Sequence, residues 1–313
     1  MNRNSMDYVS NIVWNRCMAS KPGEKALIVT DPDGERLEIA EALKSQCPCE
    51  CRLMKMKPTG MAGREPGQEV AAAMFEADIV LAPTQHSITH TRATAAARNV
   101  GARVATMPEI TKDMFLRAIP IDYEKMNKEN VLLKKILQKI NKLRITASAG
   151  TCIEVGLMKG REIENDNGLT TKPGELNNLP AGEVCFAPKE GCTNGVVFFD
   201  ISSLGKRLKK PFKVVVKDGN AVNCENKELW KILSSVKNGT NVAEFALGTN
   251  PKAKPTGKIL EDEKIRGTAH IAFGTSAALG GTVQTSIHLD NVFDKPTVEA
   301  DGKAIIKEGK FLF

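Results

Sequence analysis

Two of the four histidines in the chain lie near its C-terminal end, close to an acidic residue. His270 lies in one apolar run, and His288 and Asp290 follow, two residues apart, in a second one. Residues i and i+2 of an extended strand point to the same face, so His288 and Asp290 would project side by side. His270 would join them if its strand runs alongside. Two imidazoles and one carboxylate on one surface form half of a metal site and leave positions open for water or substrate.

Two glutamates extend this set. Glu244 lies in the strand-like run NVAEFALGTN, where it is expected to share one face with its small neighbours Val242 and Ala246. A carboxylate among small apolar neighbours is costly to bury unless it is paired or bound to a metal. Glu183 follows a predicted turn at the start of another strand. The candidate metal centre therefore comprises Glu183, Glu244, His270, His288 and Asp290.

The other two histidines lie in the segment TQHSITHT, residues 84–91, directly after an apolar strand-like run. Open α/β sheets bind ligands at the carboxyl ends of their strands, so His86 and His90 are candidate catalytic residues that would handle a substrate proton. The alternative is that Ser87 or Thr89 caps a helix and that both histidines are merely exposed. Both interpretations remain open.

Strand-like and helical patterns alternate regularly in the N-terminal part of the chain, which contains the 84–91 segment. Apolar strand-like runs at 25–30, 49–56, 77–84 and 102–108 are separated by helical patterns at 35–46, 68–77 and 89–100. This alternation predicts a doubly wound, mostly parallel α/β sheet. No G-x-G-x-x-G follows the first strand, so a dinucleotide is not indicated.

The second half of the chain has a different pattern. Turns at Asp218-Gly219 and Asp301-Gly302 predict β-hairpins, and other strand-like runs surround them. A lysine-rich amphipathic helix over 121–143 is a plausible connector. We therefore expect two domains: an α/β open-sheet domain over 1–143, and an α+β domain over 144–313 that carries the metal site.

Composition narrows the range of possible functions. The chain of 313 residues is 42% hydrophobic and 26% charged, as is usual for a soluble protein. The formal net charge is +7, but the lysines are mixed with acids, so we expect no nucleic acid partner. No apolar run approaches the ~20 residues of a membrane helix, and the N-terminus lacks a signal-peptide pattern. A cytoplasmic protein with its eight cysteines reduced is expected.

The chain resembles the thermophilic metalloprotease family of aminopeptidase T, whose superfamily includes an iron-dependent 2,5-dihydroxypyridine dioxygenase. The resemblance covers most of the chain and is strongest from Asn177 onward, in the blocks NLPAGEVCFAP with NGVVFFD, NVAEFALGTN, HIAFG, and SIHLD with KPTVEADGKAI. It implies a two-metal centre and a homodimer. The ligands it implies are Glu244, His270, His288 and Asp290, with Glu183 as the nearest match to the first glutamate.

The chain departs from the aminopeptidase pattern at two positions. Those proteins carry paired glutamates after the proline, where Gly182 precedes Glu183 here. They also carry a tyrosine seven residues beyond the first histidine, where this chain has Ala277. The remaining two histidines and one aspartate have the composition of the facial triad of non-haem Fe(II) oxygenases.

Three functions follow as hypotheses. The first, which we favour from the sequence, is removal of N-terminal residues from peptides by water activated on zinc, cobalt or manganese, with Glu183 or Glu244 as the base. The alternative is cleavage of a dihydroxylated ring by Fe(II) bound to the triad, with a histidine of the 84–91 segment as the base. The third is a metal-free binding or structural protein. The partner is expected to be a small molecule or short peptide.

Overall fold

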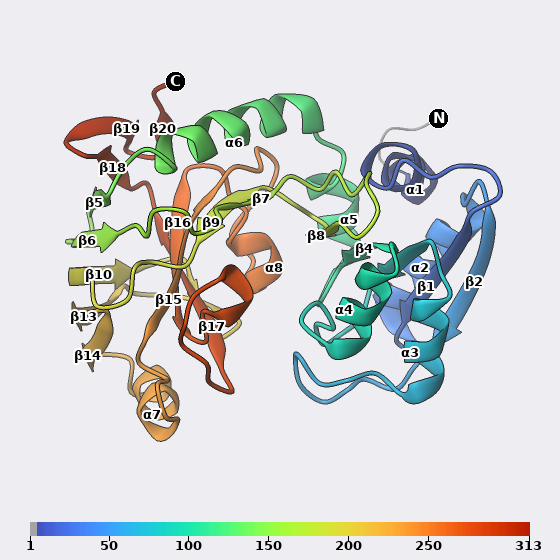
Figure 1. The fold of residues 1–313 in the computed structure, drawn as a ribbon, viewed down its shortest axis with the longest axis horizontal. Helices are drawn as coiled ribbons and strands as arrows, with labels where there is room; N and C mark the ends of the chain where they lie inside the picture. Colours follow the sequence, from blue (N-terminus) through green and yellow to red (C-terminus); the bar gives the residue numbers. More distant parts are fainter. Residues whose placement is uncertain (1–4) are drawn as a thin grey trace. The chain divides into compact units, whose positions relative to one another are not determined.

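The structure, a computed structural model, describes residues 5–313. Its contacts divide the chain into two compact units, and Figure 1 shows the sheets within each. One unit comprises Met1–Tyr123 and Asp166–Ala181, and the other comprises Glu124–Asn165 and Gly182–Phe313. These units differ from the expected division at 143 in two ways. The lysine-rich helix groups with the second unit from Glu124 onward, and Asp166–Ala181 returns to the first unit.

The first unit contains a five-stranded parallel sheet with the order β2-β1-β3-β4-β8. The predicted parallel sheet is therefore confirmed. Its strands are β1 (Lys25–Thr30), β2 (Glu50–Lys55), β3 (Ile79–Ala82), β4 (Arg103–Thr106) and β8 (Leu176–Asn178). Its helical elements are α1 (Met6–Ile12), the π-helical η1 (Val13–Cys17), α2 (Gly34–Ser45), α3 (Gln68–Phe75), α4 (Arg92–Asn99) and α5 (Lys112–Ala118).

The second unit contains two further sheets. An eight-stranded antiparallel sheet has the order β14-β13-β10-β6-β5-β18-β19-β20, and a seven-stranded sheet has the order β12-β11-β17-β16-β15-β9-β7. The first is built from β5 (Lys142–Thr146), β6 (Cys152–Gly156), β10 (Thr193–Phe199), β13 (Phe212–Lys217), β14 (Asn220–Cys224), β18 (Thr297–Ala300), β19 (Lys303–Lys307) and β20 (Lys310–Phe311). The second is built from β7 (Glu164–Asp166), β9 (Glu183–Phe186), β11 (Ser202–Ser203), β12 (Lys206–Arg207), β15 (Val242–Gly248), β16 (Thr268–Gly274) and β17 (His288–Asp294).

One hydrophobic core joins these two sheets. It combines side chains such as Ile145 and Val197 of the eight-stranded sheet with Phe245 and Ile271 of the seven-stranded sheet. The helices of this unit are α6 (Tyr123–Leu137), α7 (Lys227–Ser235), α8 (Ile259–Asp262) and the 3-10 helix η2 (Ala277–Leu279). Leu133 of α6 belongs to the same core, which explains why the helix groups with this unit.

The predicted hairpins form. In the turn between β13 and β14, Asp218 and Gly219 have φ angles of 48° and 72°. Two positive φ angles are what a two-residue type I′ turn requires, and they match the right-handed twist of the strands. Asp301 and Gly302 repeat this arrangement between β18 and β19, with φ angles of 43° and 88°.

Strand β15 contains a bulge that the sequence did not predict. Val242 pairs with Phe273 and Glu244 pairs with Ala272, so Ala243 is an extra residue on β15. A bulge shifts the alternation of side chains by one position. Val242 therefore faces the hydrophobic core, and its expected place on the face of Glu244 is wrong. In the part of the chain that the structure describes, no helix combines the length and apolar character of a membrane span.

Candidate metal centre

Four of the predicted ligands lie on one face of the seven-stranded sheet, in neighbouring strands. Asp290 of β17 pairs with Ala272 of β16, and Ala272 pairs with Glu244 of β15. These three side chains form one row across the sheet. Because the middle side chain is a single methyl group, the two carboxylates can approach each other above it.

The histidines also face small residues. His270 of β16 pairs with Ala246 on β15, and His288 of β17 pairs with Gly274 on β16. Gly274 has a φ angle of 121°, and a Cβ built on it would lie 2.1 Å from the carbonyl oxygen of Ile287. The register of three strands therefore brings the imidazoles to the carboxylate row and keeps the space between them free of bulky side chains.

Glu244 lies within hydrogen-bonding distance of both histidines. His270 Nε2 lies 3.3 Å from Glu244 Oε1, and His288 Nε2 lies 3.0 Å from Glu244 Oε2. Asp290 Oδ1 lies 3.5 Å from His288 Nε2 and 3.8 Å from His270 Nε2. The side chain of His270 is 1% exposed, whereas that of His288 is 32% exposed. The cluster is thus buried at His270 and open to solvent at His288.

This geometry fits a divalent metal. Metal–ligand bonds of about 2.0–2.2 Å place neighbouring ligand atoms roughly 3.0–3.5 Å apart, close to the separations found here. The donor atoms of Glu244, His270 and Asp290 all lie within 4.8 Å of one another. His288 Nδ1 donates to the carbonyl oxygen of Thr275 at 2.8 Å, which directs Nε2 toward the carboxylates. A set of imidazoles and carboxylates suits several first-row metals and does not select among them.

The charges of the metal-free cluster support the same interpretation. Burial opposes ionisation of Glu244, but hydrogen bonds from the two histidines hold its pKa well below the ordinary value. Burial also opposes charge on His270, yet Glu244, Glu183 and Asp290 raise the pKa of this imidazole to about 9. Against the same effect of burial, Asp290 and Glu244 raise the pKa of His288 well above 6.5. In the metal-free protein, protons on the histidines thus occupy the nitrogen atoms that would bind a metal ion.

Glu183 lies beside this cluster and has a different partner. Its Oε2 atom is 3.7 Å from His270 Nε2, and its Oε1 atom is 2.5 Å from Nζ of Lys264. Lys264 is fully buried and also lies 2.9 Å from Oε1 of Glu263. Burial raises the pKa of Glu183 to about 8, and Lys264 opposes this rise.

Sequence reasoning missed Lys264 and Glu263. They lie in the segment LEDEKIRG, which has the composition of a solvated charged surface. No spacing within this segment indicates that its lysine is buried. Its carboxylate partner, Glu183, lies 81 residues earlier in the sequence. Only the three-dimensional structure shows the contact.

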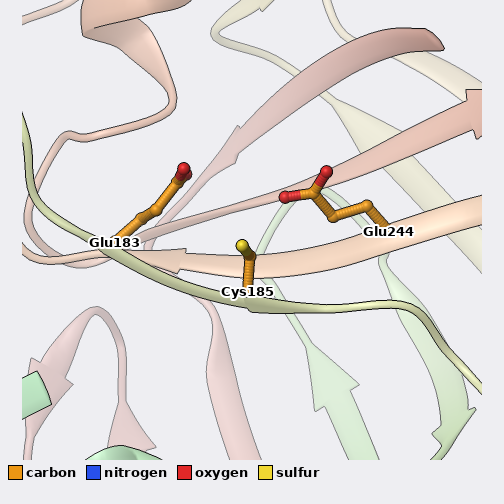
Figure 2. Close-up of side chains that lie close together, drawn as sticks. All are labelled: Glu183, Cys185 and Glu244. Carbon is orange, nitrogen blue, oxygen red and sulfur yellow. The ribbon is translucent and has the colours of Figure 1, made fainter. Parts of the chain in front are cut away.

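A thiol also borders the cluster. Figure 2 shows Cys185, two residues after Glu183 on β9, with its sulfur directed into the space between the carboxylates of Glu183 and Glu244. The thiol is buried with Ala246 and Leu279. Burial, followed by the charges of Glu244 and Glu183, raises its pKa well above the ordinary value. Cys185 is therefore a protonated thiol in the metal-free protein, and with Glu183 and Glu244 it forms a further group of potential ligands.

The backbone explains the departure at Gly182. Gly182 has a φ angle of 131°, and a Cβ built on it would lie 2.7 Å from both N and Cβ of Asn250. No glutamate can occupy this position unless the chain around Asn250 moves. The second departure, Ala277, lies exposed at the start of the short helix η2. Neither position offers a group for chemistry.

The 84–91 segment belongs to the other compact unit. The cap of helix α4 is Thr91, whose side chain accepts from the backbone N–H of Thr94. The alternative of a helix cap at Ser87 or Thr89 is therefore wrong. Ser87 and Thr89 instead hydrogen-bond to each other at 2.8 Å because the helix begins only after them.

The two histidines of this segment differ in exposure. His86 is half-buried, and its carbonyl oxygen accepts from the hydroxyl of Thr84 at 2.8 Å. His90 is exposed. Within their unit they follow the carboxyl end of β3, as expected. Their catalytic role remains a prediction.

Comparisons with known proteins add a family. The sequence model described as NicX, 2,5-dihydroxypyridine 5,6-dioxygenase, matches residues 17–227. This match includes Glu183 and ends before Glu244. No curated protein sequence matches the chain significantly.

Two solved structures share the fold. The structure of 2,5-dihydroxypyridine dioxygenase from Pseudomonas putida KT2440 has a TM-score of 0.83 and 14% sequence identity, over 100% of this chain and 98% of that chain. Wild-type AmpT from Thermus thermophilus has a TM-score of 0.74 and 15% identity, over 98% of this chain and 99% of that chain. At these identities the likeness concerns the fold alone.

Proposed function

We propose that this chain, which belongs to the 2,5-dihydroxypyridine 5,6-dioxygenase family, is a metal-dependent dioxygenase that opens a dihydroxylated aromatic ring. The observation that carries the proposal is the family match over residues 17–227. The cluster of two imidazoles and two carboxylates supports it, because it is a suitable ligand set for Fe(II). The substrate class comes from the family, and a ring related to 2,5-dihydroxypyridine is the first choice.

The aminopeptidase hypothesis, which the sequence favoured, has less support. AmpT has the lower TM-score of the two structures, 0.74 against 0.83. The first of the paired glutamates of the aminopeptidases could not be accommodated here, because the backbone at Gly182 leaves no room for a side chain. The findings therefore favour the alternative of ring cleavage over peptide hydrolysis.

The residues of the chain would divide the work as follows. Glu244, His270, His288 and Asp290 would hold the metal, which supplies Lewis acidity and, as Fe(II), the capacity for oxygen chemistry. Thr275 fixes the ring of His288 through its carbonyl oxygen. The exposed side of the cluster at His288 is where a ring substrate would enter.

Deprotonation of a ring hydroxyl needs a base. Glu183 Oε2 is buried and has no hydrogen-bond partner among the described residues, so it is one candidate. A carboxyl group whose pKa is raised toward neutrality is suited to proton transfer. His86 and His90 are the other candidates.

Oxygen uptake tests the proposal. We expect protein reconstituted anaerobically with Fe(II) to consume oxygen when 2,5-dihydroxypyridine or a related diol is added. Asp290→Asn should abolish uptake. Asp294→Asn, the same change four residues along β17 at a partly exposed position, should leave it intact.

The contrary result is equally measurable. Release of amino acids from dipeptides or aminoacyl amides by zinc-, cobalt- or manganese-loaded protein, without oxygen uptake by the iron-loaded form, would establish the peptidase hypothesis instead.

A further inference from the structure

We infer that Lys264 acts as a second cation, which partly balances the charges of Glu183 and Glu263 and limits the centre to one divalent ion. This inference rests on the metal centre proposed above. Lys264 lies outside the ligand set, and the number of bound ions is independent of the reaction.

The described residues form three overlapping groups of potential ligands. One includes the thiol of Cys185 with Glu183 and Glu244, and two combine carboxylates with an imidazole. Of these two, one consists of Glu244, His270 and Asp290, with His288 adjoining. The other consists of Glu183, Glu263 and His270, whose donor atoms also lie within 4.8 Å of one another. Donor type does not separate these two groups, since each contains carboxylates and an imidazole. By composition alone, the face could bind two ions that share His270.

Lys264 distinguishes the two groups. Its Nζ lies 2.5 Å from Glu183 Oε1 and 2.9 Å from Glu263 Oε1, so the ammonium group sits between the carboxylates of the second group. The side chain of Lys264 is 0% exposed, and those of Glu183 and Glu263 are 9% and 12% exposed. A buried ammonium group requires such partners, and removing it would leave both carboxylates poorly compensated.

The backbone fixes the lysine in this position. Asn250 donates its N–H to the carbonyl oxygen of Lys264 at 2.8 Å, and its own carbonyl oxygen accepts from Arg266 at 3.0 Å. Gly182, which precedes Glu183, packs directly against Asn250. The segments that carry Glu183 and Lys264 are thus held together through one intermediate residue. The same close contact excludes a further acidic side chain at Gly182.

The charges of the ligand set match those of one divalent ion. With both histidines neutral, the carboxylates of Glu244 and Asp290 balance one divalent cation. Glu183 and Glu263 are partly balanced by Lys264, and a second divalent ion there would lie close to the ammonium group. Repulsion between these cations would weaken binding of that ion.

The test counts manganese ions per chain. Mn²⁺ is chosen because it prefers carboxylate and imidazole over the eight thiols of the chain. Wild-type, Lys264→Arg and Lys264→Met proteins would be stripped with a chelator, saturated with Mn²⁺, desalted and analysed by elemental analysis and electron paramagnetic resonance. We expect one ion in the wild type and in Lys264→Arg. Lys264→Met should bind close to two, with the spectrum of a coupled pair.

Two results would overturn the inference: two ions in the wild type, or one ion in a folded Lys264→Met. Lys264→Met leaves two buried carboxylates without their cation, so thermal unfolding is measured as well. Stabilisation of this variant by Mn²⁺ beyond that of the wild type supports the inference. If the variant does not fold, Glu263→Gln/Lys264→Met removes one of the two carboxylates and provides the same count. A second ion in that folded double variant would support the inference, and a single ion in it would overturn it.

These outcomes are separate from those of the oxygenase test. One ion per chain, with a second gained on loss of Lys264, supports the inference even if no oxygen is consumed. Two ions in the wild type contradict it whatever the activity.

Discussion

At the scale of single residues, Glu244 is the point where the cluster converges, because its two oxygens contact both histidines. The spacing of His288 and Asp290 predicted that these side chains share a face, since i and i+2 positions do so in a strand without a bulge. Lys264 could not be predicted in the same way. Its partner Glu183 is distant in sequence, and a lysine among acids has the pattern of an exposed surface.

The histidines give the metal-free protein a defined pH dependence. The pKa of His270 rises from 6.5 to about 9 in the folded state because Glu183, Glu244 and Asp290 face it. A raised imidazole pKa contributes stability that is complete below pH 6.5 and is lost as pH rises through 9. We therefore expect the melting temperature of the chelator-treated protein to fall between pH 6.5 and 9.

Thermal unfolding across this range, with and without bound metal, checks the prediction. The metal-loaded protein should not show the same decline, because metal binding requires neutral imidazole and is favoured as pH rises. A melting temperature of the metal-free protein that increases steadily from pH 6.5 to 9 would contradict the assigned charges.

At the scale of elements, local sequence patterns predicted the strands, helices and hairpins whose backbone geometry is regular. Alternating strand and helix patterns predicted the parallel sheet, and Asp-Gly pairs predicted the hairpins. Strand β8 was not predicted, because Leu176–Asn178 has only three residues and two of them are polar asparagines. The bulge at Ala243 was not predicted either, since the alternating pattern of NVAEFALGTN fits an unbroken strand. Pairing with distant strands determines both features.

Gly182 provides a prediction at this scale. Gly182→Ala should destabilise the protein by about 1–3 kcal/mol, because a positive φ angle strains any other residue and the new methyl group would meet the backbone of Asn250. Gly67→Ala is the matched control. A Cβ at Gly67 meets nothing within 4 Å and its φ angle is −58°. Urea unfolding measures both, and equal stability of the two variants would contradict the close packing at Gly182.

At the scale of the whole molecule, the candidate ligands belong to one compact unit. Glu244, His270, His288 and Asp290 all lie within Gly182–Phe313, on strands β15, β16 and β17. A metal bound there would join three strands of one sheet. The homodimer expected from the family resemblance remains a prediction.

Metal removal should therefore act on one unit selectively. We expect backbone hydrogen exchange to accelerate in β15, β16 and β17 after chelation, because a ligand that binds only the folded state suppresses its opening. The parallel sheet of the first unit, for example β1 and β3, serves as the internal control. Equal acceleration in both units, or none in β15–β17, would contradict the assigned ligands.

The most direct test of the proposed centre is the metal content of the native protein, purified without added metal and under exclusion of oxygen. We expect one iron per chain, lost in Asp290→Asn and retained in Asp294→Asn. Two zinc- or cobalt-like ions per chain, or iron that persists in Asp290→Asn, would contradict this expectation.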